Sequence, residues 1–449
     1  MAGDTIRRMK SVLRAIAPFL LAGLSACAPV KPDVLSRHAP DGGPLPQADG
    51  DLREAAARHL PSMVELYRHF HANPELSYQE VKTAARLASE WRQAGWDVVE
   101  KIGGTGVAAT IKNGPGPVVL FRVDMDALPV KEETGLPYAA TGDAMHACGH
   151  DLHMAAGVGL AKLLVDLKSR WKGTAILIGQ PAEELGTGSK RMIEDPAFDT
   201  FIAKAGAPSW CLSIHDSNEL PAGSVGVCPG WAYANVDTID ITIHGKGGHG
   251  ARPEQTVDPI VIASELVLSL QTIVSRKIKP GTPAVITVGS IHAGTKHNII
   301  SAEAKLQLTV RSYEDAVRER LLAEIRRIAE QVCAAHGAPK PPEMKIDPEY
   351  CPAGYHDPVL ADRMSGIFRR ILGADRVRPM APVMGGEDFG RFGKRFGVPS
   401  LQYWVGAVDP AKIGTEIPPL HSSKWAPAAE PALQTAILTL GAAALDLLR

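Results

Sequence analysis

The sequence carries no excess of charge of either sign. Its 449 residues include 48 Lys and Arg and 49 Asp and Glu, for a formal net charge of −1. Nucleic acid and anionic membrane surfaces attract clustered basic charge, so the composition gives no electrostatic reason to expect either as a partner. Internal repeats and long low-complexity tracts are also missing, and the hydrophobic fraction of 45% is average. The length therefore predicts a globular body of two or three domains.

Cysteine is scarce and scattered, which argues against a disulfide framework. Besides Cys27 near the N-terminus, the chain has five cysteines, an odd number, at widely separated positions. Cys211 and Cys333 lie in apolar stretches and are most simply small core residues. Cys148 stands among polar residues, within MHACGHDLHM (145–154), which also holds three histidines and an aspartate. This stretch is the first candidate for chemistry.

A hydrophobic run long enough to cross a membrane is missing near the N-terminus. The apolar segment SVLRAIAPFLLAGLSA, which follows a basic start, is shorter than the ~20 residues that span a bilayer. The pattern predicts a secretory signal over residues 1–27. Its last residues, LSAC, resemble the lipobox of bacterial lipoproteins, so we expect an exported periplasmic or cell-envelope lipoprotein anchored through Cys27. A plainly cleaved signal or a frayed helix is the alternative. Residues 28–50 are rich in Pro, Gly and Asp and predict a flexible tether.

Short apolar runs alternate with helical segments over residues 51–231 and again over 350–449. Strands are expected at PVVLFRV, TAILIGQ, SWCLSI and PSLQYWVG, with helices such as HMAAGVGLAKLLVDLKS between them. This alternation predicts an α/β fold with a mostly parallel sheet covered by helices. Sites in such sheets lie beyond the carboxyl ends of the strands. Three of the runs lead directly to potential ligands, namely Asp124 and Asp126, Glu183 and Glu184, and His215.

The pattern changes over residues 232–349. NVDTIDITIHG alternates like a half-buried strand, and DPIVIASELVLSLQTIVSRK is an amphipathic helix. The full order of strand, helix, strand, strand, helix, strand predicts a ferredoxin-like α+β domain. We therefore expect a discontinuous catalytic domain with an inserted lid or dimerisation domain.

The residue types around Cys148 favour metal-assisted hydrolysis. In an extended CGH segment, Cys148 and His150 would point the same way and could reach one point. If the chain turns just before Glu183 and Glu184, one carboxylate can face a metal while the other faces the substrate as a general base. A thiolate, imidazoles and a carboxylate suit Zn²⁺, Co²⁺ or Mn²⁺ better than Ca²⁺ or Mg²⁺. A cysteine nucleophile, with His150 or His153 as its base, and a merely polar loop remain open alternatives.

Eight stretches together resemble one known family. They are HANPELSYQE, RVDMDALPV, MHACGHDLHM, QPAEE, HGKGGHGARP, HNII, GGEDF and LHSSKW. From about residue 52 to the C-terminus, the chain is similar to the hippurate hydrolase and auxin-conjugate amidohydrolase branch of the dimetal aminoacylase–carboxypeptidase family. The ordered set is specific, although no single member is. Two stretches depart from the family's pattern, IHDSNELPAG and HSSKW.

The resemblance implies a site with two divalent ions, Mn, Zn or Co, and a role for each matching residue. Glu183 matches the general acid/base, and Asp126 matches a carboxylate that orients a metal ligand. His249 matches a histidine that reaches into the partner subunit's site and stabilises the oxyanion, which implies a homodimer. The metal ligands, with a bridging cysteine, match Cys148, His150, Glu184, His215 and His421. The substrate-binding residues match Asn298 and Arg311, which hold a carboxylate, and Gly385 and Gly386.

These features predict a metal-dependent amidohydrolase. We expect it to cleave the amide of a hippurate-like N-acyl or N-aroyl amino acid, or of a dipeptide, to a carboxylic acid and a free amino acid. A non-catalytic metal- or peptide-binding lipoprotein is the first alternative. A hydrolase that uses Cys148 as a nucleophile is the second.

Overall fold

The computed structural model describes residues 47–449. The predicted signal, Cys27 and residues 28–46 of the predicted tether lie outside the described residues. The first described helix, α2 (Gln47–Ala72), begins inside the predicted tether. The prediction of a tether is therefore wrong for residues 47–50, which join a helix whose Leu52 and Ala55 are buried in the core.

An eight-stranded mixed sheet forms the larger body, in the order β1-β2-β4-β3-β5-β16-β6-β15. The pairs β3–β4, β3–β5, β5–β16 and β6–β15 are parallel, and the other three are antiparallel. The strands are β1 (Asp97–Ile102), β2 (Gly106–Asn113), β3 (Val118–Asp124), β4 (Gly173–Gln180), β5 (Trp210–Pro221), β6 (Val225–Val227), β15 (Val377–Pro379) and β16 (Ser400–Val408).

The two faces of this sheet bury different side chains, as alternation along a strand requires. In β4, Ala175 and Leu177 belong to the core on one face, whereas Ile176 and Ile178 belong to the core on the other. All eight residues of β4 and all nine of β16 are buried. This is the pattern of a sheet covered on both sides, and the predicted α/β fold is confirmed.

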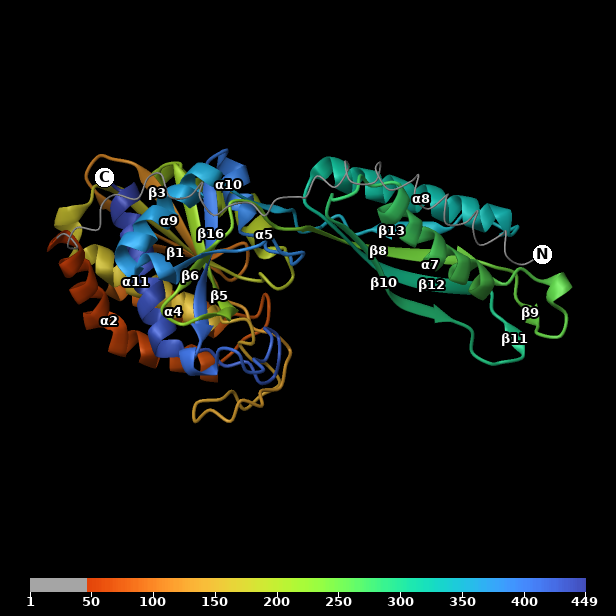
Figure 1. The fold of residues 1–449 in the computed structure, drawn as a ribbon, viewed down its shortest axis with the longest axis horizontal. Coiled ribbons are helices and arrows are strands. Elements are labelled where there is room, and N and C mark those ends of the chain that lie inside the picture. The colour runs from red at the N-terminus through yellow and green to blue at the C-terminus, as the bar shows by residue number, and fades with distance from the viewer. Residues whose placement is uncertain (1–46) are drawn as a thin grey trace, which may run out of the picture. The chain divides into compact units, whose positions relative to one another are not determined.

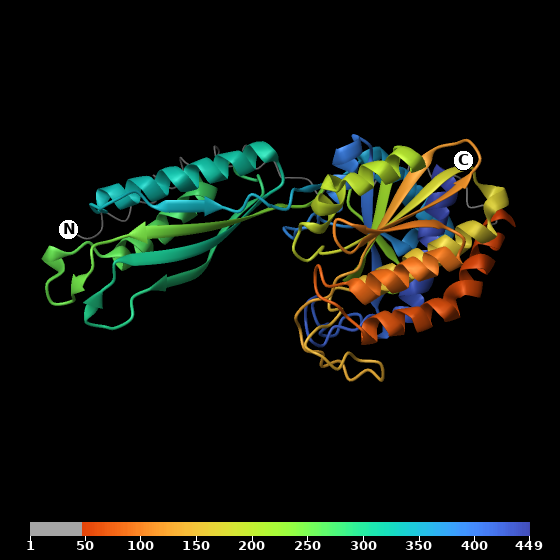
Figure 2. The ribbon, with the colours of Figure 1, turned by 180° about the vertical axis from the view of Figure 1, so that it is seen from behind.

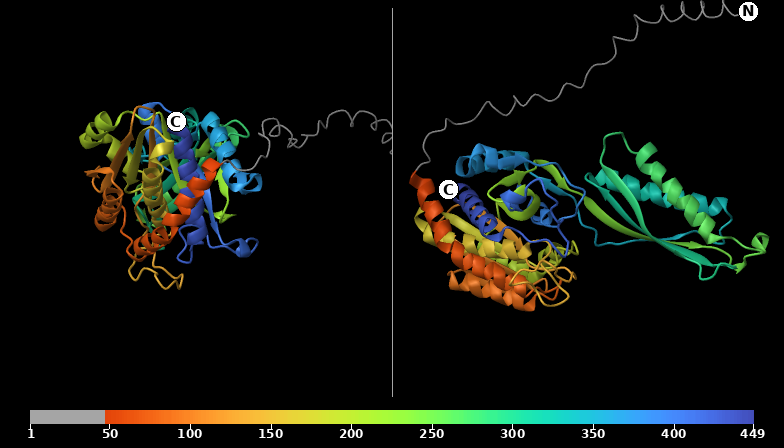
Figure 3. Two further views of the ribbon diagram at one scale, coloured as in Figure 1. Left: turned by 90° about the vertical axis from the view of Figure 1, so that its left-hand side faces the viewer. Right: turned by 60° about the horizontal axis from the view of Figure 1, so that its bottom comes forward.

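Helices cover both faces of the sheet (Figure 1 and Figure 2). The first face carries α2, α3 (Val81–Gln93), α4 (His150–Asp166), α9 (Pro358–Leu372) and α11 (Ala429–Leu447). The second face carries α5 (Gly188–Glu194), α6 (Pro196–Ala205) and α10 (Gly390–Phe396). The helix α9 starts where the Asp357 carboxylate accepts a hydrogen bond from the Leu360 backbone N–H, and its first residue is a proline. Helices α2 and α11 pack side by side (Figure 3).

The inserted segment forms a separate four-stranded antiparallel sheet, in the order β10-β12-β8-β13. Its elements are β8 (Asn235–His244), α7 (Pro259–Arg276), β10 (Ala284–Ala293), β12 (Glu303–Ser312), α8 (Asp315–Ala335) and β13 (Glu343–Ile346). Inward side chains of β8, such as Ile239, Ile241 and Ile243, join residues of both helices in a core of their own. The chain order and the strand order confirm the predicted ferredoxin-like lid.

Two short antiparallel pairs complete the described structure. One joins β9 (Gly248–His249) to β11 (Ile299–Ile300) within the inserted segment. The other joins β7 (Gly230–Tyr233) to β14 (Gly354–His356), which lie just before and just after that segment in the chain. This second pair brings the two connections to the lid together.

Candidate active site

Cys148 and His150 converge because a helix begins between them. Gly149 adopts a left-handed conformation with φ of 74°, and His150 is the first residue of α4. A Cβ atom at Gly149 would overlap the Asp216 carboxylate, so only glycine fits this turn. The prediction that the CGH segment is extended is wrong, although the two side chains do meet as expected.

The predicted metal ligands lie close together in the structure. The Cys148 Sγ is 3.5 Å from His215 Nε2 and 3.3 Å from His421 Nε2. On the other side of the thiol, the Glu184 carboxylate lies 3.5 Å from His421 Nε2 and 3.9 Å from His150 Nε2. Cys148 is common to two groups of donors that could each hold an ion, one with His150 and His215 and one with Glu184 and His421.

The donor set fits two divalent ions. Ligand atoms that share one tetrahedral ion lie roughly 3.3–3.6 Å apart, with the larger separations between sulfur and nitrogen, and the separations around Cys148 are close to this range. Within residues 47–449, His150 Nε2 and Glu184 Oε1 are buried and have no hydrogen-bond partner. Such buried polar atoms normally have partners, and a cation between them would satisfy both. A cation would also balance the negative charge of a Cys148 thiolate and of the carboxylates gathered here.

Asp126 holds the paired glutamates in place. Its carboxylate accepts hydrogen bonds from the backbone N–H groups of Glu183 (3.0 Å) and Glu184 (3.1 Å) and from the Ser77 hydroxyl (2.7 Å). The backbone carbonyl of Asp126 accepts a bond of 2.8 Å from His150 Nδ1, which leaves Nε2 free to face the cluster. The expected turn before the glutamates is present, with Ala182 at φ of 48°. Asp126 therefore orients both a histidine and the glutamate pair.

The sequence did not reveal a buried polar network behind the ligands. His153 Nδ1 donates to Asp124 (2.6 Å), and His153 Nε2 accepts the backbone N–H of Asp216 (2.9 Å). Asp124 is also paired with Arg122, a fully buried guanidinium on the same strand. The Arg122 guanidinium reaches Glu387 at 3.0 Å, in the GGEDF stretch. The alternation of Arg122 and Asp124 along one strand face was the signal that could have indicated this network.

The prediction that strand SWCLSI ends at His215 is wrong. The strand β5 continues to Pro221, and His215 pairs with Trp404 of β16. The Asp216 carboxylate accepts a hydrogen bond of 3.2 Å from the indole of Trp425. Trp425, the tryptophan of HSSKW, thus donates a hydrogen bond to Asp216, the residue that follows His215. The two stretches that depart from the family's pattern are therefore in contact.

Burial and mutual charge shift the pKa values of the central groups. Burial would raise the pKa of the Cys148 thiol, but His215, His150 and His421 lower it well below its usual range. Burial raises the pKa of Glu183 well above its usual range, and Glu387 and Glu184 raise it further. A thiolate is the form that binds metal, and a carboxyl group with a raised pKa suits proton transfer near neutral pH.

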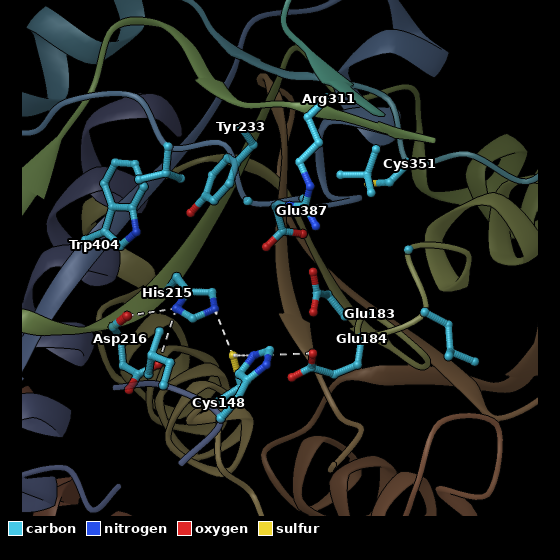
Figure 4. Close-up of a pocket in the computed structure, with 18 of the residues that line it drawn as sticks. Cys148, Glu183, Glu184, His215, Asp216, Tyr233, Arg311, Cys351, Glu387 and Trp404 are labelled. Carbon is cyan, nitrogen blue, oxygen red and sulfur yellow. Dashed lines mark hydrogen bonds and ion pairs between the residues drawn. The ribbon is translucent and has the colours of Figure 1, made fainter. Parts of the chain in front are cut away.

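These groups form the floor of a cavity of about 530 Å³. Figure 4 shows Cys148, Glu183, Glu184 and His215 on one side of the cavity. Arg311 enters from the opposite side, where its Nη1 donates to the Met384 backbone carbonyl at 2.7 Å. Predicted residues Gly385 and Gly386 also line the cavity, together with Tyr233, Trp404 and Cys351.

Two predicted residues lie elsewhere. The described residues that line the cavity include neither His249 nor Asn298, and both side chains are exposed. They are neighbours in the β9–β11 ribbon, where the Gly250 backbone N–H donates to the Asn298 carbonyl at 2.9 Å. Within one chain, neither residue can serve the cavity in this arrangement.

A buried cysteine, histidine and glutamate cluster at the carboxyl ends of a mostly parallel sheet defines a metal-binding hydrolase. The comparisons agree. Residues 120–438 match the model of Peptidase family M20/M25/M40. The chain is 37% identical over 368 residues to thermostable carboxypeptidase 2 of Saccharolobus solfataricus, covering 81% of this chain and 90% of that protein. It is 36% identical to an N-acetylcysteine deacetylase of Bacillus subtilis, covering 77% and 88%.

The solved structure of the Bacillus subtilis YXEP protein, described as a dinuclear metal-binding peptidase of the M20 family, is also similar. It has a TM-score of 0.71 and 30% identity, and the match covers 87% of this chain and 99% of that one. This chain belongs to Peptidase family M20/M25/M40, and it is a metal-dependent hydrolase of amide bonds. The alternative of a non-catalytic binding protein is thereby set aside.

Proposed function

We propose that this hydrolase cleaves hippurate-like N-acyl or N-aroyl amino acids, or dipeptides, to a carboxylic acid and a free amino acid. The observation that supports this substrate class is the position of Arg311 across the cavity from Glu183 and the ligand cluster. An amide beside Glu183 would then have its carboxylate within the reach of a guanidinium, which binds carboxylates through paired hydrogen bonds. The deacetylase among the relatives is named for an N-acetylated amino acid.

In the proposed reaction Glu183 moves the proton. Its carboxylate takes a proton from the attacking water and returns it to the nitrogen of the leaving amino acid. Two divalent ions of Mn, Zn or Co, held by the five predicted ligands, would polarise the amide carbonyl and lower the pKa of water. Arg311 holds the substrate carboxylate, and the absence of side chains at Gly385 and Gly386 lets the substrate approach the backbone closely.

We also propose a homodimer and an exported, lipid-anchored location. His249 and Asn298 match residues that act on substrate, yet they lie outside their own chain's cavity, and a partner subunit would give them a site. The support for export and for an anchor at Cys27 is the N-terminal sequence pattern alone. Intact mass of the protein extracted from membranes tests the anchor, and light scattering tests the dimer.

The experiment is hydrolysis of a small panel by the purified protein. The panel contains N-acetyl and N-benzoyl amino acids, including N-benzoylglycine, and a few dipeptides. Each is assayed as isolated, after chelation, and after Mn²⁺, Co²⁺ or Zn²⁺ is added back. We expect release of the free amino acid that is lost on chelation and restored by metal. Activity on dipeptides but on no N-acyl amino acid would narrow the substrate class to dipeptides, and activity on neither would contradict the proposal. Activity that survives thorough chelation would favour a thiol mechanism at Cys148.

A further inference from the structure

Tyr233 occupies the cavity wall without an assigned role. It is the last residue of β7 and pairs with Gly354 of β14. Its ring packs against the rings of Trp404 and His356, with centroids 5.5 Å and 6.0 Å apart. A Cβ at Gly354 would press on the ring at 3.2 Å, so the tyrosine lies in a closely fitted slot. The packing fixes the position of its hydroxyl.

That hydroxyl is buried and has no hydrogen-bond partner among residues 47–449. A nearby acceptor, the Glu387 carboxylate, already accepts from Arg122, from Gln402 at 2.7 Å and from the Phe389 backbone N–H at 2.8 Å. A buried hydroxyl without a partner lowers stability, and such exceptions in folded proteins call for an explanation. A phenylalanine would fill the same slot at no such cost. The position therefore retains a donor that the folded chain itself does not use.

The hydroxyl is directed away from Arg311 and toward the predicted metal ligand His215 (Figure 4). Figure 4 shows it pointing to the side where Trp404 and His215 lie, and away from Arg311. Burial raises the pKa of Tyr233 well above its usual range, and the charges of Glu387 and Glu183 raise it further. The phenol thus keeps its proton and offers a donor at any working pH. What it needs is an acceptor oxygen brought by the substrate.

We propose that the Tyr233 hydroxyl donates a hydrogen bond to the carbonyl oxygen of the scissile amide. The inference rests on the proposed function, because it takes the amide to lie beside Glu183 and its carboxylate to lie at Arg311. With the carboxylate end directed to Arg311, the proposal places the carbonyl group on the side of the cavity where His215 and Tyr233 lie (Figure 4). No proton is transferred: the bond strengthens as negative charge develops on that oxygen, which lowers the barrier more than it tightens binding.

The test is Tyr233→Phe, which removes one oxygen and keeps the ring. We expect kcat to fall about 100- to 1,000-fold, the range for loss of one donor to such an oxygen. The KM and the bound metal should change little, and the loss should be of similar size for N-acetyl and N-benzoyl substrates, because both present the same carbonyl. The thermal midpoint should be equal to or above that of the wild type, because an unpartnered buried hydroxyl is removed.

Tyr403→Phe is the matched control. The Tyr403 hydroxyl is also buried but lies in the core, where it is 2.9 Å from the Thr439 hydroxyl. This variant should lose thermal stability and keep its kcat, the opposite of the Tyr233 result. Four results for Tyr233→Phe would each overturn the inference and leave the proposed function standing. They are a wild-type kcat, an effect on KM alone, a fall in kcat that depends on the acyl group, and a loss of bound metal. A wild type that hydrolyses no N-acyl amino acid or dipeptide would overturn both.

Discussion

Replacing Asp126 with asparagine should loosen the site without changing its shape. The carboxylate accepts the backbone N–H of Glu183 with one oxygen and that of Glu184 with the other. An asparagine retains one acceptor oxygen and turns an NH₂ group toward the other N–H. One buried donor is then left without an acceptor, which costs about 1–3 kcal/mol. Because the Asp126 carboxylate also lies 3.4 Å from His150 Nδ1 and fixes the backbone of the ligand Glu184, metal affinity should fall about 10- to 100-fold.

Urea unfolding and competition with a chelator measure the two effects. Asp143→Asn is the control for the change of charge, because Asp143 is exposed on a loop, and it should change the free energy of unfolding by less than about 0.5 kcal/mol. If Asp126→Asn unfolds with the wild-type free energy and binds metal with the wild-type affinity, the Asp126 carboxylate does not hold the glutamate pair in place. A loss of affinity alone would mean that the backbone relaxes to recover its hydrogen bond.

Two further predictions concern other positions. Gly149→Ala adds the strain of a positive φ, about 1–2 kcal/mol, and an overlap with Asp216, so it should abolish metal binding. Gly95→Ala is the control: its φ of 83° is similar but the space around it is open, so it should show the strain alone. Metal analysis and urea unfolding measure the two effects. Burial disfavours a charged His71, but its carboxylate partners, led by Asp151, raise its pKa to about 9. The pKa of His71 in the folded protein lies above its unfolded value of about 6.5, so the ion pairs of His71 stabilise the fold fully below pH 6.5. This stabilisation is lost as pH rises through 9, and the free energy of unfolding then falls by at most about 1.4 kcal/mol per pH unit. If urea unfolding of His71→Gln has the same pH dependence as that of the wild type, the predicted contribution of His71 is wrong.

The sequence predicted the metal site and the lid domain, because the residue types and local patterns there are rarely found for other reasons. A cysteine, histidines and paired glutamates after apolar runs indicated a metal site, because buried ionisable groups need partners. The order of elements over 232–349 predicted the lid domain, since alternation and helical spacing are local patterns. The resemblance then indicated individual ligands, such as His421, that spacing alone would leave among surface histidines.

What sequence could not show depends on contacts between distant segments. The ion pair of Arg122 with Glu387 joins residues 265 positions apart, and the indole of Trp425 reaches Asp216 across 209 positions. The sequence does not single out Tyr233, because only the folded chain shows that its hydroxyl is buried in the cavity wall without a partner among residues 47–449. The prediction of an extended CGH segment was wrong because a glycine can adopt a left-handed turn at the start of a helix, and the alternation of side chains along a strand does not reveal such a turn.

The role of Glu183 in metal-dependent hydrolysis is tested by measuring the hydrolysis of N-benzoylglycine by the wild type and by Glu183→Gln, with the bound metal of each protein counted. Glu90→Gln, on α3 and outside the cavity, is the control for the same substitution elsewhere. We expect the wild type and the control to release glycine. Glu183→Gln should retain its metal but turn over at least about 100-fold more slowly, since proton transfer is lost. Wild-type turnover in Glu183→Gln would show that Glu183 does not transfer the proton.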